Sequence, residues 1–136
     1  MNARLAVTAG DPRGIGPEII LKALADPRVG ERSDLMIVGP EGCGVEVDVA
    51  IGEWIAGGDA GSAGHLAGKA IEKAVELVQR GEVQGIVTAP IDKHALLEGG
   101  FDFPGHTEML AELTGSRVAM MLASDALRVV LATTHV

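Results

Sequence analysis

Residues 5–18 read LAVTAGDPRGIGPE and hold a complete passage from strand through turn to helix. The apolar run at 5–8 predicts a short buried strand, and the glycines after it predict a tight turn. Pro17 suits the first helical position, and Glu18 lies where the helix dipole favours a carboxylate. We therefore expect a strand, a glycine-rich turn and a helix that runs to about Ala25.

The same alternation of strand and helix continues along the rest of the chain. Further strands are predicted at 35–38, 45–49, 85–88, 118–122 and 127–132, and further helices at 62–80, 92–98 and 106–113. The alternation favours a mostly parallel sheet with helices on both faces, a three-layer α/β/α fold. Residues 1–136 are expected to form a single α/β unit, with Gly81 as the left-handed cap of the longest helix.

The composition indicates a globular chain with an aliphatic core. Hydrophobic residues make up 47% of the 136 residues and aromatic residues only 2%, and this length suffices for one ordinary domain. Cys43 is the single cysteine, which excludes an intrachain disulfide and a cysteine metal cluster. No apolar run reaches about 18 residues and no signal peptide is recognisable, so we expect no membrane partner and a cytoplasmic location.

The formal net charge of −8 argues against a nucleic-acid partner. Binding to a phosphate backbone needs clustered Lys and Arg, and binding to single strands needs aromatic platforms. A small phosphorylated substrate needs only a few local cations, so the acidic surface leaves that kind of partner open.

The glycine turn at 10–16 admits two interpretations. Turns of this kind expose backbone donors to a phosphate, but the spacing matches neither the dinucleotide fingerprint nor the P-loop, and Glu18 repels an anion. A tight turn that serves packing is the favoured alternative. Asp11 and Arg13 are polar groups at the carboxyl end of a strand, which leaves a functional role open.

Residues 88–93 form a second polar turn after a strand. Asp92 is expected to cap the following helix by accepting hydrogen bonds from free backbone amides. Lys93 either reaches back to an anionic substrate or is a solvated lysine in the first helical turn. The pattern by itself favours the solvated lysine.

Two histidines lie at the ends of predicted elements. His106 and Thr107 begin a helix, where free amides suit an anionic group and the dipole lowers the pKa of a histidine. The alternative is a Thr107 cap beside an exposed histidine. His135 could bind a metal through a neutral nitrogen, although a histidine at a strand end more often only forms a hydrogen bond.

The other candidate residues have simpler interpretations. His65 and His94 are expected at the surface or at its boundary with the interior, and Met120 and Met121 in the core. Cys43 lacks the neighbouring base that a nucleophile needs.

Four of these segments together resemble the N-terminal part of the 4-hydroxythreonine-4-phosphate dehydrogenase family, which serves pyridoxal phosphate (vitamin B6) biosynthesis. They follow the order of the family: Gly10–Glu18, Thr88–Lys93, Pro104–Glu108 and Leu127–His135. The resemblance implies an isocitrate/isopropylmalate dehydrogenase-like fold and a homodimer or higher self-association.

The resemblance also implies an activity. The family oxidises 4-phosphooxy-L-threonine, a small phosphorylated hydroxy amino acid, with NAD (or NADP), and the resulting β-keto acid loses carbon dioxide to give 3-amino-2-oxopropyl phosphate. A divalent metal ion (Zn, Mg or Co) polarises the alcohol oxygen. By resemblance, His106 and Thr107 bind the substrate and His135 is the first of three histidine metal ligands, whereas no catalytic or cofactor-binding residue is assigned.

The chain departs from the family pattern in its extent. The other two metal histidines and most cofactor contacts belong to a C-terminal half outside these 136 residues, and the stretch between Val38 and the long helix is shorter than in relatives. A truncated enzyme is therefore expected, with a catalytically silent fragment, a small α/β binding module, or a relative acting on another phosphorylated hydroxy acid as alternatives. An uncovered strand at 127–132 predicts self-association or poor solubility.

Overall fold

The computed structural model describes residues 2–133, which fall into two compact units divided between Phe103 and Pro104. Each unit has its own secondary structure and is described by itself. The expectation that residues 1–136 form a single α/β unit stays a prediction.

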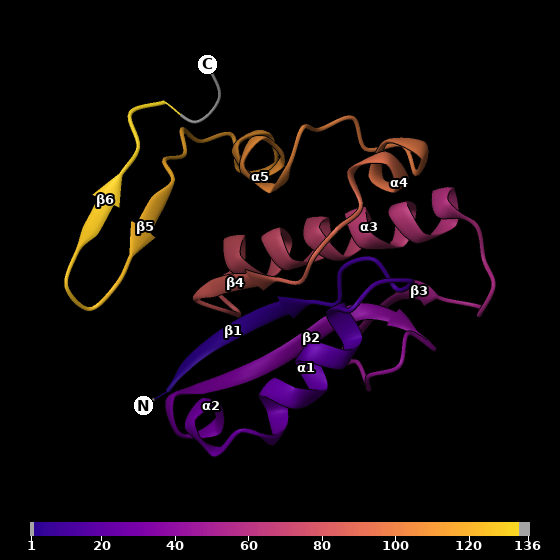
Figure 1. Cartoon of the computed structure of the whole chain (residues 1–136), viewed down its shortest axis with the longest axis horizontal. Helices are drawn as coiled ribbons and strands as arrows, with labels where there is room; N and C mark the ends of the chain where they lie inside the picture. Colours follow the sequence, from indigo (N-terminus) through magenta and orange to yellow (C-terminus); the bar gives the residue numbers. More distant parts are fainter. Residues whose placement is uncertain (1, 134–136) are drawn as a thin grey trace. The chain divides into compact units, whose positions relative to one another are not determined.

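The first unit is built on a four-stranded parallel sheet (Figure 1). Its strands, in the spatial order β3-β2-β1-β4, are β1 (Ala3–Thr8), β2 (Ser33–Glu41), β3 (Val49–Glu53) and β4 (Gly85–Thr88). In register, Val7 of β1 lies between Ile37 of β2 and Val87 of β4. The predicted parallel sheet is confirmed for this unit, and β1 is an interior strand.

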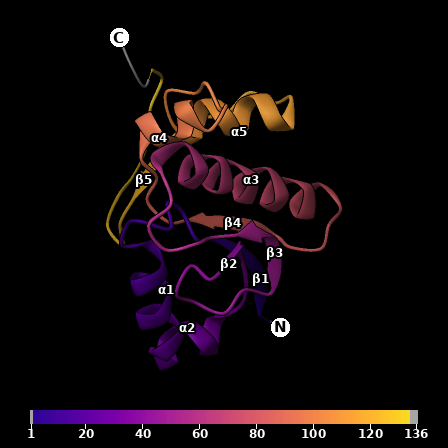
Figure 2. The same ribbon diagram turned by 90° about the vertical axis from the view of Figure 1, so that its right-hand side faces the viewer.

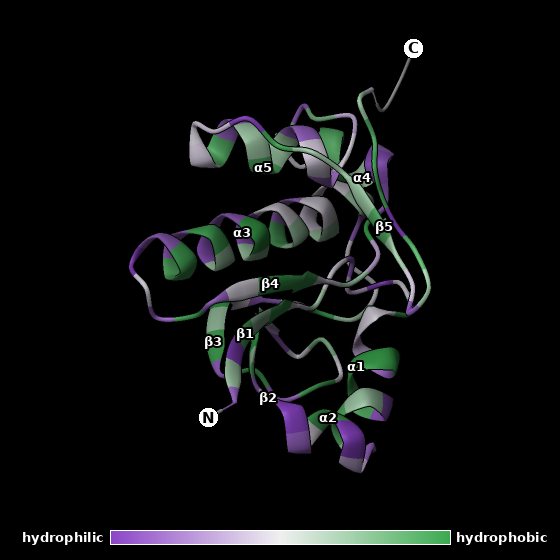
Figure 3. Ribbon diagram, turned by 90° about the vertical axis from the view of Figure 1, so that its left-hand side faces the viewer, coloured by the Kyte–Doolittle hydropathy of each residue, from purple (hydrophilic) through white to green (hydrophobic). Residues whose placement is uncertain are grey.

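Helices cover both faces of this sheet, as Figures 2 and 3 show. The helices are α1 (Gly16–Ala25) and α2 (Pro27–Arg32) on one face, and α3 (Ala60–Gln79) on the other, with α4 (Lys93–Glu98) packed on α3. Helices α1, α2 and α3 lie in the connections from β1 to β2 and from β3 to β4, which bring the chain back to the end of the sheet where the next parallel strand starts. The predicted three-layer α/β/α arrangement is confirmed.

Alternation along the strands builds a separate core on each face. Val7 and Ile37 pack with Ile20 of α1, whereas the adjacent strand residues Ala6 and Val38 pack against α3. Successive side chains of a strand point to opposite faces, so a strand covered on both sides must be apolar at consecutive positions. This requirement explains why the strands have continuous apolar sequences.

The longest helix, α3, follows the predicted pattern closely. Its buried face includes the predicted residues Leu66, Ala70, Ala74 and Leu77. Gly81 follows the helix with a φ of 73°, and its N–H donates to the Val78 carbonyl at 2.9 Å. The predicted left-handed cap is confirmed.

The length of α3 does not make it a membrane helix. It carries two pairs of opposite charge on its outer side, Lys69 with Glu72 and Lys73 with Glu76. Within residues 2–133, no helix combines the length and the apolar composition that a bilayer crossing demands.

The strand predicted at 45–49 is wrong, because pairing with β2 begins only at Val49. Just before it, the Asp48 carboxylate accepts a hydrogen bond from the Ile37 amide at 2.7 Å, and the Asp48 N–H donates to the Ile37 carbonyl at 2.9 Å. The side chain thus takes the acceptor role that a strand carbonyl would fill. Gly44, with a φ of 105°, turns the preceding chain out of extended geometry.

Over residues 104–133, the second unit contains one helix and one hairpin. Its elements are α5 (His106–Thr114), β5 (Met121–Ala123) and β6 (Arg128–Val130), and the two strands pair antiparallel. The strands predicted at 118–122 and 127–132 therefore exist in shorter form. They form a separate two-stranded sheet and, within the described residues, do not extend the parallel sheet.

The prediction that Met120 and Met121 belong to the core is wrong. Met121 is 54% exposed, and Met120 is partly exposed. A hairpin of two strands buries neither of its faces by itself, so an apolar strand sequence does not produce a core here.

Substitution of Gly64 by alanine tests the contact between α3 and α4. A Cβ at Gly64 would overlap the backbone carbonyl of Ala95 in α4, and that carbonyl cannot give way unless the helix shifts. We expect Gly64→Ala to lower the free energy of unfolding by about 1–3 kcal/mol. Urea unfolding followed by far-UV circular dichroism measures this difference.

Gly61→Ala is the matched control in the same helix. A Cβ at Gly61 would lie 3.6 Å from its nearest neighbour, the Glu98 carbonyl oxygen, which is ordinary contact. Alanine also favours helix over glycine by about 1 kcal/mol. Equal destabilisation by the two substitutions would contradict the close approach at Gly64.

Candidate functional site

The direction of the strand order reverses next to β1. The chain passes from β1 to β2 and β3 on one side and then returns through α3 to β4 on the other side. The loop after β1 leads to α1 on one face of the sheet, and the loop after β4 leads to α4 on the opposite face. In open α/β sheets ligands bind at such a point, beyond the carboxyl ends of the strands.

The two loops at this point are in direct contact. Gly10 has a φ of 73°, and a Cβ there would collide with the Pro90 carbonyl. The Asp11 N–H donates to the same carbonyl at 3.1 Å. Gly10 therefore has two reasons to be glycine, its left-handed backbone and the lack of room for a side chain.

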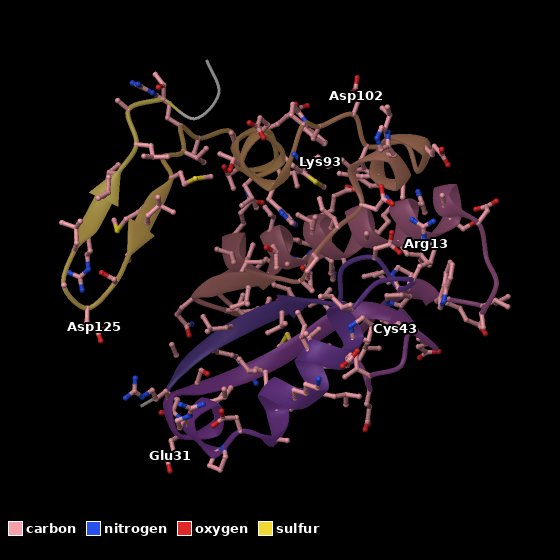
Figure 4. All side chains as sticks on the ribbon, viewed as in Figure 1. Arg13, Glu31, Cys43, Lys93, Asp102 and Asp125 are labelled. Carbon is pink, nitrogen blue, oxygen red and sulfur yellow. The ribbon has the colours of Figure 1, made fainter. Side chains whose placement is uncertain are left out.

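Arg13, whose side chain is labelled in Figure 4, joins the two loops through its guanidinium group. Its Nε donates to Asp11 Oδ1 at 3.1 Å and its Nη2 donates to Asp11 Oδ2 at 2.7 Å, which is a two-point ion pair. The same Nη2 donates to Asp92 Oδ2 at 3.2 Å. The Asp11 side chain is 6% exposed and that of Asp92 is 49% exposed, so Asp11 is the fixed partner and Asp92 the open one.

Hydrogen bonds favour the charged forms of two members of this cluster, Asp92 and Arg13. Backbone N–H donors, first that of Ala95 and then that of His94, hold the pKa of Asp92 below its ordinary range, and the Arg13 charge acts in the same direction. The side-chain hydrogen bond with Asp11 raises the pKa of Arg13. With two carboxylates against one guanidinium group, the formal charge of the cluster is negative.

An open cavity of about 440 Å³ lies between the two loops. Its lining consists of Asp11, Arg13, Gly14 and Ile15 from the loop after β1, and of Pro90, Ile91 and Asp92 from the loop after β4. The lining includes both charged and apolar side chains, and the volume is within the range of small-molecule sites. This cavity is the candidate functional site of the first unit.

The prediction for Asp92 as a helix cap is confirmed, and its bond to Arg13 was not anticipated from sequence. Asp92 Oδ1 accepts from the amides of His94 at 2.9 Å and Ala95 at 3.1 Å. Lys93 is exposed at the first position of α4. The sequence does contain a hint of this ion pair, because polar residues follow each of the two strands. It does not show that these two strands are neighbours in the sheet.

His106 and Thr107 occupy the first two positions of α5 in the second unit. The N-cap is Gly105 and makes no side-chain cap hydrogen bond, so the alternative of a Thr107 cap beside an exposed histidine is wrong. His106 is partly buried, and its Nε2 atom is buried without a hydrogen-bond partner among the described residues. Burial lowers the pKa of His106. The assignment of both residues to substrate binding stays a prediction.

His135 lies outside the described residues, so its assignment as a metal ligand also stays a prediction. Within residues 2–133, no group of three or more His, Cys, Asp or Glu side chains is arranged to hold a metal ion. A catalytic zinc normally needs about three protein ligands. The described part of the chain therefore does not fit a complete metal site.

The simpler interpretations of three other residues agree with the structure. His65 and His94 are exposed, as expected. Cys43 is buried, with its Sγ 3.8 Å from the Val45 carbonyl oxygen, which agrees with a structural thiol.

Comparisons of this chain with known proteins agree on one family. The family described as "Pyridoxal phosphate biosynthetic protein PdxA" matches residues 19–136. A 4-hydroxythreonine-4-phosphate dehydrogenase from Synechococcus sp. (strain JA-3-3Ab) is 37% identical over 98% of this chain and 47% of its own length. A D-threonate 4-phosphate dehydrogenase from Salmonella typhimurium is 36% identical over 97% of this chain and 50% of its own length.

A solved structure gives the same result for the fold. The crystal structure of a 4-hydroxythreonine-4-phosphate dehydrogenase from Burkholderia phymatum matches all of this chain and 51% of its own, with a TM-score of 0.85 and 31% identity. This chain spans about half the length of the curated relatives that it matches. The aligned region also covers 166 residues against 136 here, so the relatives contain internal residues that this chain lacks.

The partly buried imidazole of His106 predicts a pH dependence of stability. Its pKa in the folded chain is lowered from the ordinary value of about 6.5, so the unfolded chain binds a proton first as the pH falls. The contribution of neutral His106 is complete above about pH 6.5 and is lost as the pH falls toward the folded pKa. We expect the free energy of unfolding to decrease in this window.

His106→Asn removes this ionisation and is expected to flatten the pH dependence between about pH 5 and 7. Urea unfolding at several pH values measures both proteins. Parallel curves for the two proteins would show that His106 titrates normally in the folded state.

Proposed function

The chain belongs to the family of the pyridoxal phosphate biosynthetic protein PdxA, and we propose on this basis that it is the N-terminal part of an NAD-dependent dehydrogenase for a phosphorylated hydroxy acid. The observation that carries this proposal is the match of nearly the whole chain to dehydrogenases in both sequence and fold. We also propose a cytoplasmic location, as expected from the sequence.

The proposed reaction is the oxidation of 4-phosphooxy-L-threonine followed by decarboxylation. The secondary alcohol loses its O–H proton and a hydride from the same carbon, which leaves a ketone β to the carboxylate. That carboxylate then leaves as carbon dioxide, and the product is 3-amino-2-oxopropyl phosphate. When bound, NAD (or NADP) supplies the hydride acceptor.

His106 and Thr107 are proposed to hold the substrate. A neutral imidazole can donate one hydrogen bond and accept another, and the burial that lowers the pKa of His106 favours this neutral form. The first amides of α5 are not engaged by a side-chain cap, and helix N-termini favour anionic groups. These features support contact with a carboxylate or phosphate of the substrate.

His135 is proposed as one ligand of a divalent metal ion (Zn, Mg or Co). When bound, such an ion supplies a Lewis acid for the alcohol oxygen. Because residues 2–133 offer no complete donor set, we propose that the other ligands come from the half of the family that this chain does not span.

The names of the relatives point to two candidate substrates, both of them phosphorylated hydroxy acids. One relative is a 4-hydroxythreonine-4-phosphate dehydrogenase and another is a D-threonate 4-phosphate dehydrogenase, at 37% and 36% identity to this chain. Such similar values do not separate the two. The second candidate function is a catalytically silent α/β module, because residues 2–133 offer no complete donor set for a metal ion.

An assay with the half of the family that this chain does not span distinguishes the dehydrogenase from the silent module. We expect no NADH formation by residues 1–136 alone, but formation after mixing with a polypeptide that comprises the C-terminal half of the Synechococcus relative. Each of the two phosphorylated substrates is tested with NAD or NADP and with Zn, Mg or Co. His135→Ala should lower both the metal content and the rate of the mixture.

The intact Synechococcus relative is the positive control of this assay. If the mixture forms no NADH while the intact relative does, the result would favour the binding module over the enzyme. Unchanged metal content in the His135→Ala mixture would remove His135 from the metal site.

We further propose that the chain self-associates, as a homodimer or a larger assembly. In the described sheet, β4 pairs only with β1, and an apolar groove of about 310 Å³ lies beside it between α1 and the sheet. Val87 lines this groove and is 46% exposed. An open strand edge beside an apolar surface promotes association between chains.

Sedimentation velocity at increasing protein concentration tests this proposal. We expect a rising mean sedimentation coefficient, and a shift toward monomer for Val87→Lys. Leu24→Lys is the matched control, because Leu24 is 47% exposed on α1 outside the groove and the change in charge is the same. A monodisperse monomer at all concentrations would contradict self-association.

A further inference from the structure

The cavity between the loops after β1 and β4 presents a hydrogen-bond donor and an acceptor side by side. Arg13 uses Nε and Nη2 for its bonds to Asp11 and Asp92, whereas its Nη1 has no partner among residues 2–133. Because the guanidinium group is planar and rigid, Nη1 lies next to the Nη2 that meets Asp92. The two N–H groups of Nη1 are therefore free donors on a fixed group.

Asp92 supplies the acceptor beside this donor. Its Oδ1 is engaged by the first amides of α4, which fixes the carboxylate. Its Oδ2 accepts one bond, the 3.2 Å contact from Arg13, and a carboxylate oxygen can accept a second. The side chain is 49% exposed and lines the cavity, so a ligand can reach it.

The charge of this cluster selects among ligand groups. Asp11 and Asp92 together exceed the charge of Arg13, so an inorganic anion would meet a net negative cluster. Two neighbouring hydroxyl groups suit the arrangement better, because one donates to Asp92 Oδ2 while the other accepts from Arg13 Nη1. A carboxylate after a parallel strand commonly binds a ribose in this way.

The cavity also offers apolar contacts to a ligand. Ile15, Pro90 and Ile91 are among its lining residues, and Ile15 is 58% exposed although it is a large aliphatic residue. The volume of about 440 Å³ exceeds what a single ribose fills and falls in the range of small-ligand sites.

We propose that this cavity binds a ribonucleoside part of the nicotinamide cofactor, with Asp92 and Arg13 on the ribose hydroxyls and Ile15, Pro90 and Ile91 against the base. Asp11 is then a positioning residue, because it holds Arg13 in place from a buried site and does not reach the ligand. The identity of the ligand as the cofactor rests on the proposed dehydrogenase function, whereas the recognition of a ribonucleoside rests on the cavity.

Titration of the isolated chain with nucleosides tests the proposal by a readout that needs no turnover. Adenosine and nicotinamide riboside are added separately, and the backbone amide resonances of Ile15 and Ile91 are followed by NMR. We expect saturable shifts with at least one of the two. 2′,3′-Dideoxyadenosine, which lacks both hydroxyls, should bind at least about tenfold more weakly than adenosine.

A pair of capping residues provides matched variants. Asp92→Asn keeps an oxygen for the helix cap but replaces the acceptor at Oδ2 by a donor, and it should weaken nucleoside binding by about tenfold. Asp26→Asn makes the same change at the N-cap of α2, where Asp26 accepts from the Arg28 amide at 3.0 Å outside the cavity. This control should leave binding unchanged.

Three outcomes would overturn the inference. They are the absence of saturable binding by either nucleoside, equal binding of adenosine and its dideoxy analogue, and preferred binding of inorganic phosphate at Ile15 and Ile91. The comparison of nucleosides uses the unaltered chain and does not depend on the folding of a variant. If the mixed halves form NADH but the cavity binds no nucleoside, only this inference is contradicted. If the cavity binds a nucleoside but the mixed halves form no NADH, only the proposed reaction is contradicted.

Discussion

The contact between the loops after β1 and β4 is the constraint on which the site depends. Gly10 has no side chain, so the backbone of the first loop reaches the Pro90 carbonyl of the second. This approach buries Asp11 at the junction, and a buried carboxylate requires a charged partner. Arg13 is that partner, and its second bond reaches Asp92, which at the same time caps α4. A single close approach of two loops thus fixes the conformation of both loops, the first turn of α4 and the positions of the charged residues that line the cavity.

The sheet explains why this contact occurs where it does. Strands β1 and β4 are neighbours only because the chain places β2 and β3 on the far side of β1 and returns through α3. The return requires helices on opposite faces, and the two apolar cores, one with Ile20 and one with Ala70, follow from that requirement. The cavity is thus a product of topology, and the chemistry of the loops then limits what it can hold. Within a family of dehydrogenases, a donor and acceptor pair at this position suits a ribose better than a free anion.

Local sequence rules predicted most elements of the first unit correctly. The buried face of α3, the left-handed Gly81 and the Asp92 cap all depend on neighbours within a few residues, and all three are confirmed. The strand at 45–49 was predicted wrongly, because alternation cannot reveal that the Asp48 side chain occupies a backbone position in the pairing with Ile37. The assignment of Met120 and Met121 to the core was wrong for a related reason. Apolar alternation specifies a strand but does not specify which partner strand, if any, covers it.

The functional residues divide in the same way. The sequence by itself determined the βα order, the family through four motifs, and the candidates His106, Thr107 and His135 through resemblance to that family. It also placed Asp11 and Arg13 after one strand and Asp92 after another, because strand ends and caps are local features. Only the tertiary structure decided that Arg13 bonds Asp92, a residue 79 positions away, and that a cavity lies beside the pair. The physical reason is that strand order in a parallel sheet is set by the packing of crossover helices on both faces, which no local pattern encodes.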